Sequence, residues 1–373
     1  MVTNSYLIHS ILPPHMLEHI AEHGTEAQRE KALENLSLSD QFREDRTLAP
    51  TTAMAAPDAA GPADKNRMVY SADEGSQLPG RLIRWEGEPP VSDLAVDEAY
   101  DGAGATYDMY WEEYQRNSID NSGMDIISTV HYKKGYDNAF WNGTQMVYGD
   151  GDEDLPPAQR LFNRFTSAMD IIAHELTHGV TQYTANLVYR NQPGALNEAF
   201  SDVFGVLVKQ RHLGQTAQEA DWIVGAGLFT DNVNGVGIRS MANPGTAYDD
   251  PTLGKDPQPG HMKDYVNTIQ DNGGVHINSG IPNRAFYLMA MEMGGFAWEK
   301  AGKIWYITLN ERATTNTSFQ GAANLTHAVA VDLYGAESGE QQAVINGWAG
   351  VGIQVGASEG TGCLTALFRP RGR

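Results

Sequence analysis

Cysteine and long apolar runs are nearly absent from this chain of 373 residues. Its one cysteine, Cys363, excludes an intrachain disulfide, and a single cysteine does not decide between oxidising and reducing compartments. Cys363 lies in a C-terminal tail without the histidines that would activate a cysteine nucleophile, so we interpret it as incidental. No apolar run approaches the roughly 20 residues that cross a bilayer, which disfavours a membrane-spanning protein.

Positive charge is also scarce. The chain carries 26 Lys and Arg against 47 Asp and Glu, a formal net charge of −21, with a pI of about 4.8. Nucleic acids and anionic membranes attract basic surfaces, so neither is an expected partner. Residues 1–10 lack the basic start and apolar stretch of a secretory signal peptide. The remaining composition, 41% apolar and 20% charged, suffices for two or three domains.

The segment 171–180 contains the pattern His-Glu-x-x-His. On a helix, His174 and His178 lie one turn apart on the same face and can bind one metal ion. Glu175 lies about 100° around the axis, beside that ion, where it can act as a general base. This arrangement predicts a catalytic zinc site. An apolar stripe at helical spacing supports the helix: Phe165, Ile172 and Leu176.

A second helical pattern, residues 194–202, offers a third zinc ligand. Glu198 and Asp202 are four residues apart and share a face. We assign Glu198 to the metal and Asp202 to the free ring N–H of a zinc-bound histidine. Taken alone, the first motif could arise by chance on an amphipathic helix, and the two carboxylates could be solvated surface charges.

Five segments in order resemble the thermolysin-like zinc metallopeptidases, across about residues 66–356. They are residues 138–141, 174–181, 194–202, 239–241 and 271–280. The resemblance implies a two-lobed α+β fold with the zinc helix in the cleft. We divide the chain accordingly into an N-terminal β-rich lobe, a mainly helical C-terminal lobe, and two flanking pieces. The divisions are 1–60 (propeptide and linker), 61–182, 183–356 and 357–373 (a flexible tail).

The resemblance also implies roles for other side chains. His276 and Tyr189 would stabilise the oxyanion that forms when water attacks a peptide carbonyl. Asp271 would orient His276 and favour its protonated form. Asn197, beside Glu198, would lie behind the zinc ligands with Asp202. Without the family, a lone loop histidine is more often a surface residue.

Substrate contacts follow from the same resemblance. Asn138 and Ala139 would belong to an edge strand that pairs with an extended peptide, although the local sequence also fits an ordinary hairpin. Arg239 would contact a substrate carbonyl. Ile171 and Ile238 would line a pocket for a bulky apolar side chain just after the scissile bond.

Residues before 66 have too little apolar bulk for a core of their own. Prolines before residue 15 and Gly24 bound a first predicted helix, and a capping box at residues 25–28 starts a second one, through about Leu36. The motif Pro-Pro-His-Met-Leu at 13–17 resembles, with His in place of an apolar residue, the mark of protealysin-like propeptides. We therefore expect an intramolecular inhibitor, cleaved within the linker 48–64.

The remaining segments divide by composition. Residues 66–160 predict mainly strands and turns, with strands at 125–132 and 145–149. The rest of the chain predicts helices joined by glycine-rich loops.

One departure from the family concerns calcium. Asp170 and Asp221 of its double calcium site remain, but three other positions of that site have lost their glutamates. These positions are Lys209, Ile223 and Ala226. We predict that the double site is lost and that Lys209 pairs with Asp170 or Asp221. The acidic loop 150–154 could hold calcium elsewhere or could simply be solvated.

The sequence thus predicts a zinc endopeptidase made as a proenzyme and acting on peptides as a monomer. Family resemblance implies secretion, although no signal peptide is visible. Two alternatives remain: a catalytically silent binding scaffold and a zinc aminopeptidase. The scaffold predicts damage at a catalytic position, and the aminopeptidase predicts that a blocked peptide is not cleaved.

Overall fold

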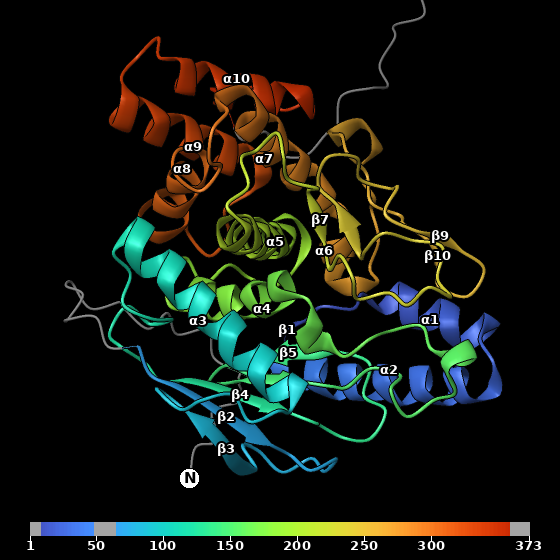
Figure 1. Ribbon diagram of the computed structural model, residues 1–373. Helices are drawn as coiled ribbons and strands as arrows, with labels where there is room; N and C mark the ends of the chain where they lie inside the picture. The colour runs from blue at the N-terminus through green and yellow to red at the C-terminus, as the bar shows by residue number, and fades with distance from the viewer. Residues whose placement is uncertain (1–8, 48–64, 359–373) are drawn as a thin grey trace, which may run out of the picture.

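The computed structural model describes residues 9–47 and 65–358, arranged in two lobes (Figure 1). A mixed sheet forms the lower lobe and a group of helices the upper one. Two central helices, α4 (Met169–Gln182) and α5 (Asn191–Leu213), pack against each other between them. The predicted two-lobed α+β architecture is confirmed. None of the described helices combines the length and apolar composition of a bilayer span.

The sheet has six strands in the order β1-β5-β6-β4-β2-β3. Their bounds are β1 His9–Ser10, β2 Arg67–Ser71, β3 Arg81–Trp85, β4 Ile126–Val130, β5 Ala139–Trp141 and β6 Met146–Tyr148. The strands predicted at 125–132 and 145–149 are therefore present as β4 and β6. β1, from the segment predicted to be a propeptide, pairs antiparallel with β5, so β5 has a partner on both sides.

A long helix, α3 (Leu94–Tyr114), corrects the prediction that residues 66–160 are mainly strands and turns. Asp93 caps it by accepting from the backbone N–H groups of Ala95 and Val96. Gly102 and Gly104 lower its intrinsic helix propensity and hide it from pattern analysis. Packing requires the first of these glycines, because a Cβ at Gly102 would lie 2.5 Å from Ile172 of α4.

The C-terminal lobe contains the predicted helices. They are α6 (Asp271–Asn278), α7 (Gly280–Met293), α8 (Ala301–Ile307), α9 (Phe319–Tyr334) and α10 (Gly339–Gly350). Residues 214–270 are mostly loops with four two-residue strands: β7 (Ile223–Val224), β8 (Arg239–Ser240), β9 (Asp249–Asp250) and β10 (Gly254–Lys255). Short helical turns complete the fold: η1 (Pro157–Gln159), η2 (Phe165–Ser167), η3 (Met262–Asp264) and η4 (Thr308–Arg312). Phe165 belongs to η2 and not, as the predicted stripe implied, to the zinc helix.

The N-terminal segment forms α1 (Pro14–His23) and α2 (Glu26–Thr47). The capping box is present: Thr25 N–H donates to Gln28 Oε1 at 2.7 Å, and Gln28 N–H to Thr25 Oγ1 at 3.4 Å. The prediction that α2 ends near Leu36 is wrong, because residues 37–47 contain neither glycine nor proline to stop it. The predicted linker 48–64, Cys363 and most of the predicted tail lie outside the described residues.

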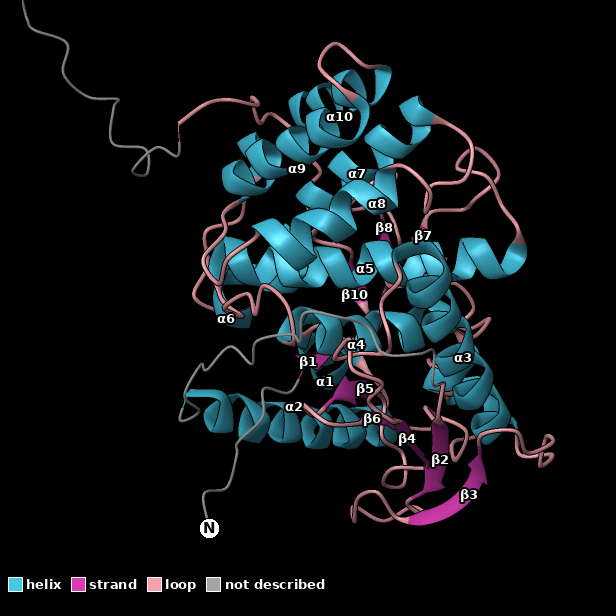
Figure 2. Ribbon diagram, turned by 90° about the vertical axis from the view of Figure 1, so that its left-hand side faces the viewer, coloured by secondary structure: helices cyan, strands magenta, loops and turns pink. Residues whose placement is uncertain are grey.

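The N-terminal segment docks on both lobes. In both views α1 lies between α2 and the helical lobe (Figure 2). Five apolar side chains of residues 11–20 are at most 3% exposed and belong to the same core cluster as the two lobes: Ile11, Leu12, Met16, Leu17 and Ile20. The segment therefore has no separate core, as its composition predicted.

Candidate active site

Three donor groups converge between α4 and α5. His174 and His178 come from α4 and Glu198 from α5, and all three are buried. The two histidine Nε2 atoms are 3.1 Å apart. Glu198 Oε2 lies 3.6 Å from His174 Nε2, and Glu198 Oε1 lies 3.5 Å from His178 Nε2.

These separations fit a single zinc ion. Ligands about 2.0–2.1 Å from a tetrahedral ion lie about 3.3 Å from one another. Glu198 Oε2 is a buried acceptor without a hydrogen-bond partner, and such an atom is costly unless a cation or donor satisfies it. Two imidazoles and one carboxylate form the donor set of a catalytic zinc site.

Both histidines are held from behind. Asp202 Oδ1 lies 2.9 Å from His174 Nδ1, and Asn197 Oδ1 lies 2.8 Å from His178 Nδ1. These contacts orient the rings so that Nε2 faces the ligand cluster. Gly205 lets α5 approach α4 this closely, because a Cβ there would lie 2.5 Å from the Asp170 carbonyl oxygen.

Asp202 is itself tied into the core. Arg239 donates two hydrogen bonds to its carboxylate, both at 2.8 Å, and Asn283 Nδ2 donates a third at 2.8 Å. Burial alone would raise the pKa of Asp202, but Arg239 and His174 outweigh it and hold the pKa below its usual range. Sequence analysis missed Asn283, because no local pattern links it to Asp202, 81 residues away.

His276 faces the cluster from a strained turn. Residues 271–274 all have positive φ, and a Cβ at Gly273 would lie 2.1 Å from Asn191 Oδ1. The turn lets Asp271 bind His276 twice, through Nδ1 at 2.6 Å and the backbone N–H at 2.8 Å. Burial lowers the pKa of His276, but Asp271 and Glu198 outweigh it and raise the pKa.

Tyr189 and Glu175 complete the cluster. The Tyr189 hydroxyl lies 3.2 Å from His276 Nε2 and donates to Glu198 Oε1. Glu175 is fully buried, and its Oε2 accepts from the backbone N–H of Trp141 at 3.1 Å. The zinc-cluster residues and the three groups predicted to act on substrate thus meet in one place.

The N-terminal segment occupies this site. The Ser10 carbonyl oxygen lies 3.1 Å from His276 Nε2. The next peptide continues along β5, where the Ile11 N–H donates to the Ala139 carbonyl at 3.2 Å.

The following residues contact the other groups predicted to bind substrate. The Leu12 N–H donates to Asn138 Oδ1 at 3.0 Å, and Arg239 Nη1 donates to the Ile11 carbonyl at 3.4 Å. Residues 10–12 therefore contact four of the side chains and backbone groups predicted to meet substrate. Sequence analysis could not say which residues of the segment would do so.

Ile171 and Ile238 also lie together, both buried. A Cβ at Gly225 would lie 3.1 Å from Ile238 Cγ1 and 3.5 Å from Ile171 Cδ1.

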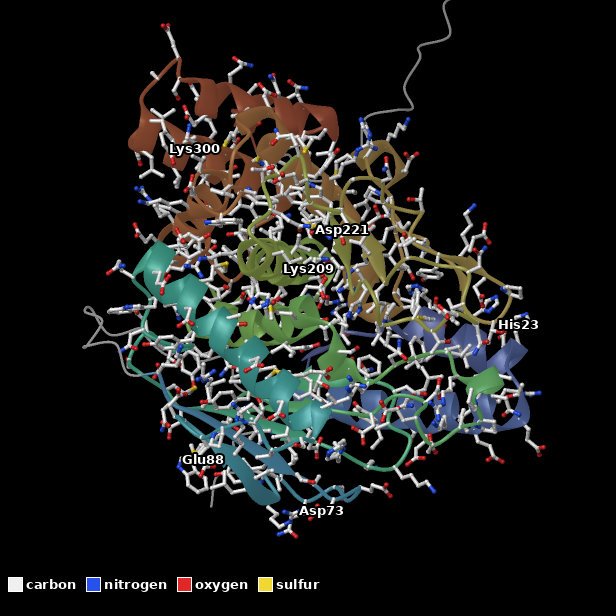
Figure 3. All side chains as sticks on the ribbon, viewed as in Figure 1. His23, Asp73, Glu88, Lys209, Asp221 and Lys300 are labelled. Carbon is white, nitrogen blue, oxygen red and sulfur yellow. The ribbon has the colours of Figure 1, made fainter. Side chains whose placement is uncertain are left out.

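Lys209, at a position where the resemblance implied a calcium-binding glutamate, lies close to Asp221 (Figure 3). Its Nζ is 3.0 Å from both Asp170 Oδ2 and Asp221 Oδ1, and it donates to the Ile223 carbonyl at 2.6 Å. The prediction that Lys209 pairs with Asp170 or Asp221 is confirmed for both.

Family comparisons agree with this geometry. Residues 42–182 match the thermolysin metallopeptidase catalytic domain and residues 185–353 its alpha-helical domain. Residues 9–37 match the protealysin propeptide.

Individual proteins are similar over nearly the whole chain. An extracellular metalloprotease of Pectobacterium carotovorum subsp. carotovorum is 50% identical, covering 93% of this chain and 96% of that protein. Protease PrtS of Photorhabdus sp. (strain Az29) is 46% identical, covering 92% of each. The solved precursor of protealysin from Serratia proteamaculans superimposes with a TM-score of 0.82 at 50% identity, covering 92% of this chain and 99% of that one. The chain belongs to the thermolysin family of metallopeptidases and carries a protealysin-type propeptide.

Proposed function

We propose that this chain is an endopeptidase precursor whose active site holds zinc through His174, His178 and Glu198. A zinc ion bound there would act as a Lewis acid that lowers the pKa of water and polarises a peptide carbonyl. The observation that carries the proposal is the Ser10 carbonyl, which lies against His276 as a substrate carbonyl would.

Glu175 is the proton carrier. Its buried carboxylate, fixed by the Trp141 N–H, accepts the proton of the attacking water and passes it to the leaving amine. His276 and Tyr189 donate to the negative charge that develops on the carbonyl oxygen. Each donor in comparable sites contributes roughly 3–4 kcal/mol to transition-state stabilisation. Asp271 orients His276 and favours its charged form, since it raises the pKa of that ring.

The propeptide inhibits by occupying the substrate path. Ser10 fills the position of the reacting carbonyl and Ile11, fully buried, that of the residue after the scissile bond. This arrangement supports a preference for bulky apolar side chains after the cleaved bond. We place the cleavage that releases the propeptide within residues 48–64. The resulting enzyme is a monomer that acts outside the cell, in keeping with two relatives whose names call them extracellular.

The first test is intact mass over time for the wild-type chain and Glu175→Ala, both with zinc. We expect the wild type to lose about 50–65 N-terminal residues, because we place the cleavage within residues 48–64, and the variant to stay intact. Trimming of the variant in the absence of other proteases would contradict self-cleavage. An N-blocked peptide, offered to the trimmed enzyme, separates an endopeptidase from an aminopeptidase.

The double calcium site of the family is replaced here by the Lys209 ion pairs. An ammonium between Asp170 and Asp221 occupies the place of the cation and leaves too few oxygens for it. We expect calorimetry to give the same calcium binding for the wild type and Asp170→Ala. Stoichiometric binding that Asp170→Ala removes would contradict this assignment.

A further inference from the structure

The peptide group between Ser10 and Ile11 is held at both of its polar ends. Its carbonyl oxygen lies 3.1 Å from His276 Nε2, one of the proposed oxyanion donors. Its N–H donates to the Ala139 carbonyl of β5 at 3.2 Å. Because one peptide group makes both contacts, the bond that joins Ser10 to Ile11 lies at the catalytic cluster in the precursor itself.

The residues after this bond meet groups that were expected to bind the amine side of a substrate. Ile11 is fully buried, and its carbonyl accepts from Arg239 Nη1 at 3.4 Å. The Leu12 N–H donates to Asn138 Oδ1 at 3.0 Å. The order along the chain is therefore the order expected of a substrate: the reacting carbonyl, then a bulky apolar residue, then a second residue that meets the edge strand.

Glu175, the proposed base, belongs to the same place. Its Oε2 accepts from the Trp141 N–H at 3.1 Å, and Trp141 stands opposite His9 in the pairing of β1 with β5. The next peptide group along the chain is bound by side chains that have no proposed part in proton transfer. Among the described bonds of this segment, Ser10–Ile11 is therefore the one whose carbonyl the structure places on a catalytic donor.

We propose that the Ser10–Ile11 bond is a self-cleavage site, cut within the precursor molecule before the propeptide leaves. The proposal rests on the proposed endopeptidase function. The oxygen of a water molecule bonds to the Ser10 carbonyl carbon as the C–N bond breaks, while His276 and Tyr189 donate to the carbonyl oxygen. Both water protons go to the Ile11 nitrogen, the first through Glu175, so Ser10 ends as a carboxylate and Ile11 as an ammonium.

The cut separates a short contact from an extended one. On its N-terminal side, β1 pairs with β5 over two residues. On its C-terminal side, Ile11 and Leu12 are buried, and α2 is held by Lys31, whose Nζ lies 3.1 Å from Asp152 Oδ1. We expect residues 1–10 to dissociate and the rest to stay docked. The shortened precursor stays inhibited, because Ile11 and Leu12 keep their places in the substrate path.

The test follows the full-length wild-type chain and Glu175→Ala by intact mass, both with zinc and at several protein concentrations. We expect the wild type to lose residues 1–10 alone, with release of the decapeptide, before the larger loss of the propeptide. Glu175→Ala should show neither event. The initial rate constant should not change on dilution, because the bond and the catalytic groups belong to one molecule. A rate constant proportional to concentration, or no species that begins at Ile11, overturns the proposal.

Ile11→Ala is the diagnostic variant. It shortens the apolar side chain just after the cut bond and should slow this cleavage by about tenfold or more, because methylenes lost from an apolar subsite have effects of this size. Leu33→Ala is the matched control. Leu33 is 57% exposed on α2, so its truncation removes a similar side chain elsewhere in the propeptide and should leave the rate unchanged. Equal slowing by both variants overturns the proposal.

A peptide experiment does not depend on how the variants fold. An N-blocked peptide with the sequence of residues 6–15, offered to the trimmed enzyme, should be cut between Ser10 and Ile11. The same peptide with Ile11→Ala should be cut about tenfold or more slowly. If the enzyme loses its propeptide and cuts other peptides, yet neither chain nor peptide is cut at this bond, the inference fails and the proposed function stands. If no peptide bond is cut at all, both fail.

Discussion

His15 is a single residue whose ionisation bears on propeptide docking. Its Nε2 lies 3.0 Å from the Tyr248 hydroxyl, and its Nδ1 is buried without a partner. Burial lowers the pKa of His15 from 6.5 to about 4; Asp271 opposes this shift, and His276 and Arg239 add to it.

This shift predicts that acid loosens the propeptide. An undocked His15 has a pKa near 6.5, so below that pH the undocked segment binds a proton that the docked one does not. Docking is therefore strongest above pH 6.5 and weakens as the pH falls towards 4, by about tenfold or more at pH 5. Amide hydrogen exchange in α1, measured on Glu175→Ala at several pH values, gives the opening equilibrium. His15→Leu should remove most of this pH dependence; an unchanged slope would contradict the role of His15.

Residues near the zinc cluster could be predicted to the extent that spacing or family motif encodes them. His174 and His178 follow from a helical repeat of four, and Glu198 with Asn197 and Asp202 from the next motif. The contact of Ser10 with His276 could not be predicted, because it joins residues 266 apart through the fold alone. The same holds for Asn283 and its bond to Asp202.

Among the elements, α3 shows how packing overrides local propensity. Gly102 weakens the helix pattern, yet it is the residue that lets α3 lie against Ile172. A sequence pattern reveals the low helix propensity of glycine but not the close packing that glycine allows. The excess length of α2 has a different origin, since neither glycine nor proline follows Leu36 before the helix ends at Thr47.

Gly102→Ala should therefore destabilise the fold, although alanine is the better helix former by about 1 kcal/mol. A Cβ placed 2.5 Å from a buried isoleucine forces side-chain or backbone shifts, and we expect a net loss of about 1–2 kcal/mol in the free energy of unfolding. Urea unfolding of the Glu175→Ala chain measures it. Gly339→Ala in α10, where a Cβ meets nothing within 4 Å, is the control and should be neutral to slightly stabilising, because only helix propensity changes there. Equal effects at both positions would contradict the packing argument.

At the scale of the whole molecule, the propeptide has two parts: a plug, residues 10–12, which occupies the active site, and an anchor, helices α1 and α2, which holds the plug in place. Residues 10–12 meet the groups of the active site, whereas α1 and α2 supply further buried apolar contacts and Lys31. Family resemblance predicted the two lobes and the inhibitor. It did not predict which residues of the propeptide block the active site and which hold the propeptide in place, because that depends on where each residue lies in three dimensions.

Separating the two parts gives a prediction. A chain beginning at Pro13 keeps α1 and α2 but loses the plug, so it should cleave an N-blocked peptide before any trimming. Intact mass and peptide hydrolysis, followed in the same sample, measure both events. The full-length chain should show hydrolysis only after trimming. A Pro13 chain that is inactive until trimmed would place inhibition in the helices instead.

The pairing of β1 with β5 has a further consequence for the newly made protein. An unpaired strand edge is a template on which another chain can add, and many copies of one protein can assemble through such edges. The precursor carries its own strand for that edge, so crowded, freshly synthesised chains are protected from joining one another. Under the proposed maturation, loss of β1 opens this edge to a polypeptide substrate, which the enzyme would cleave and release.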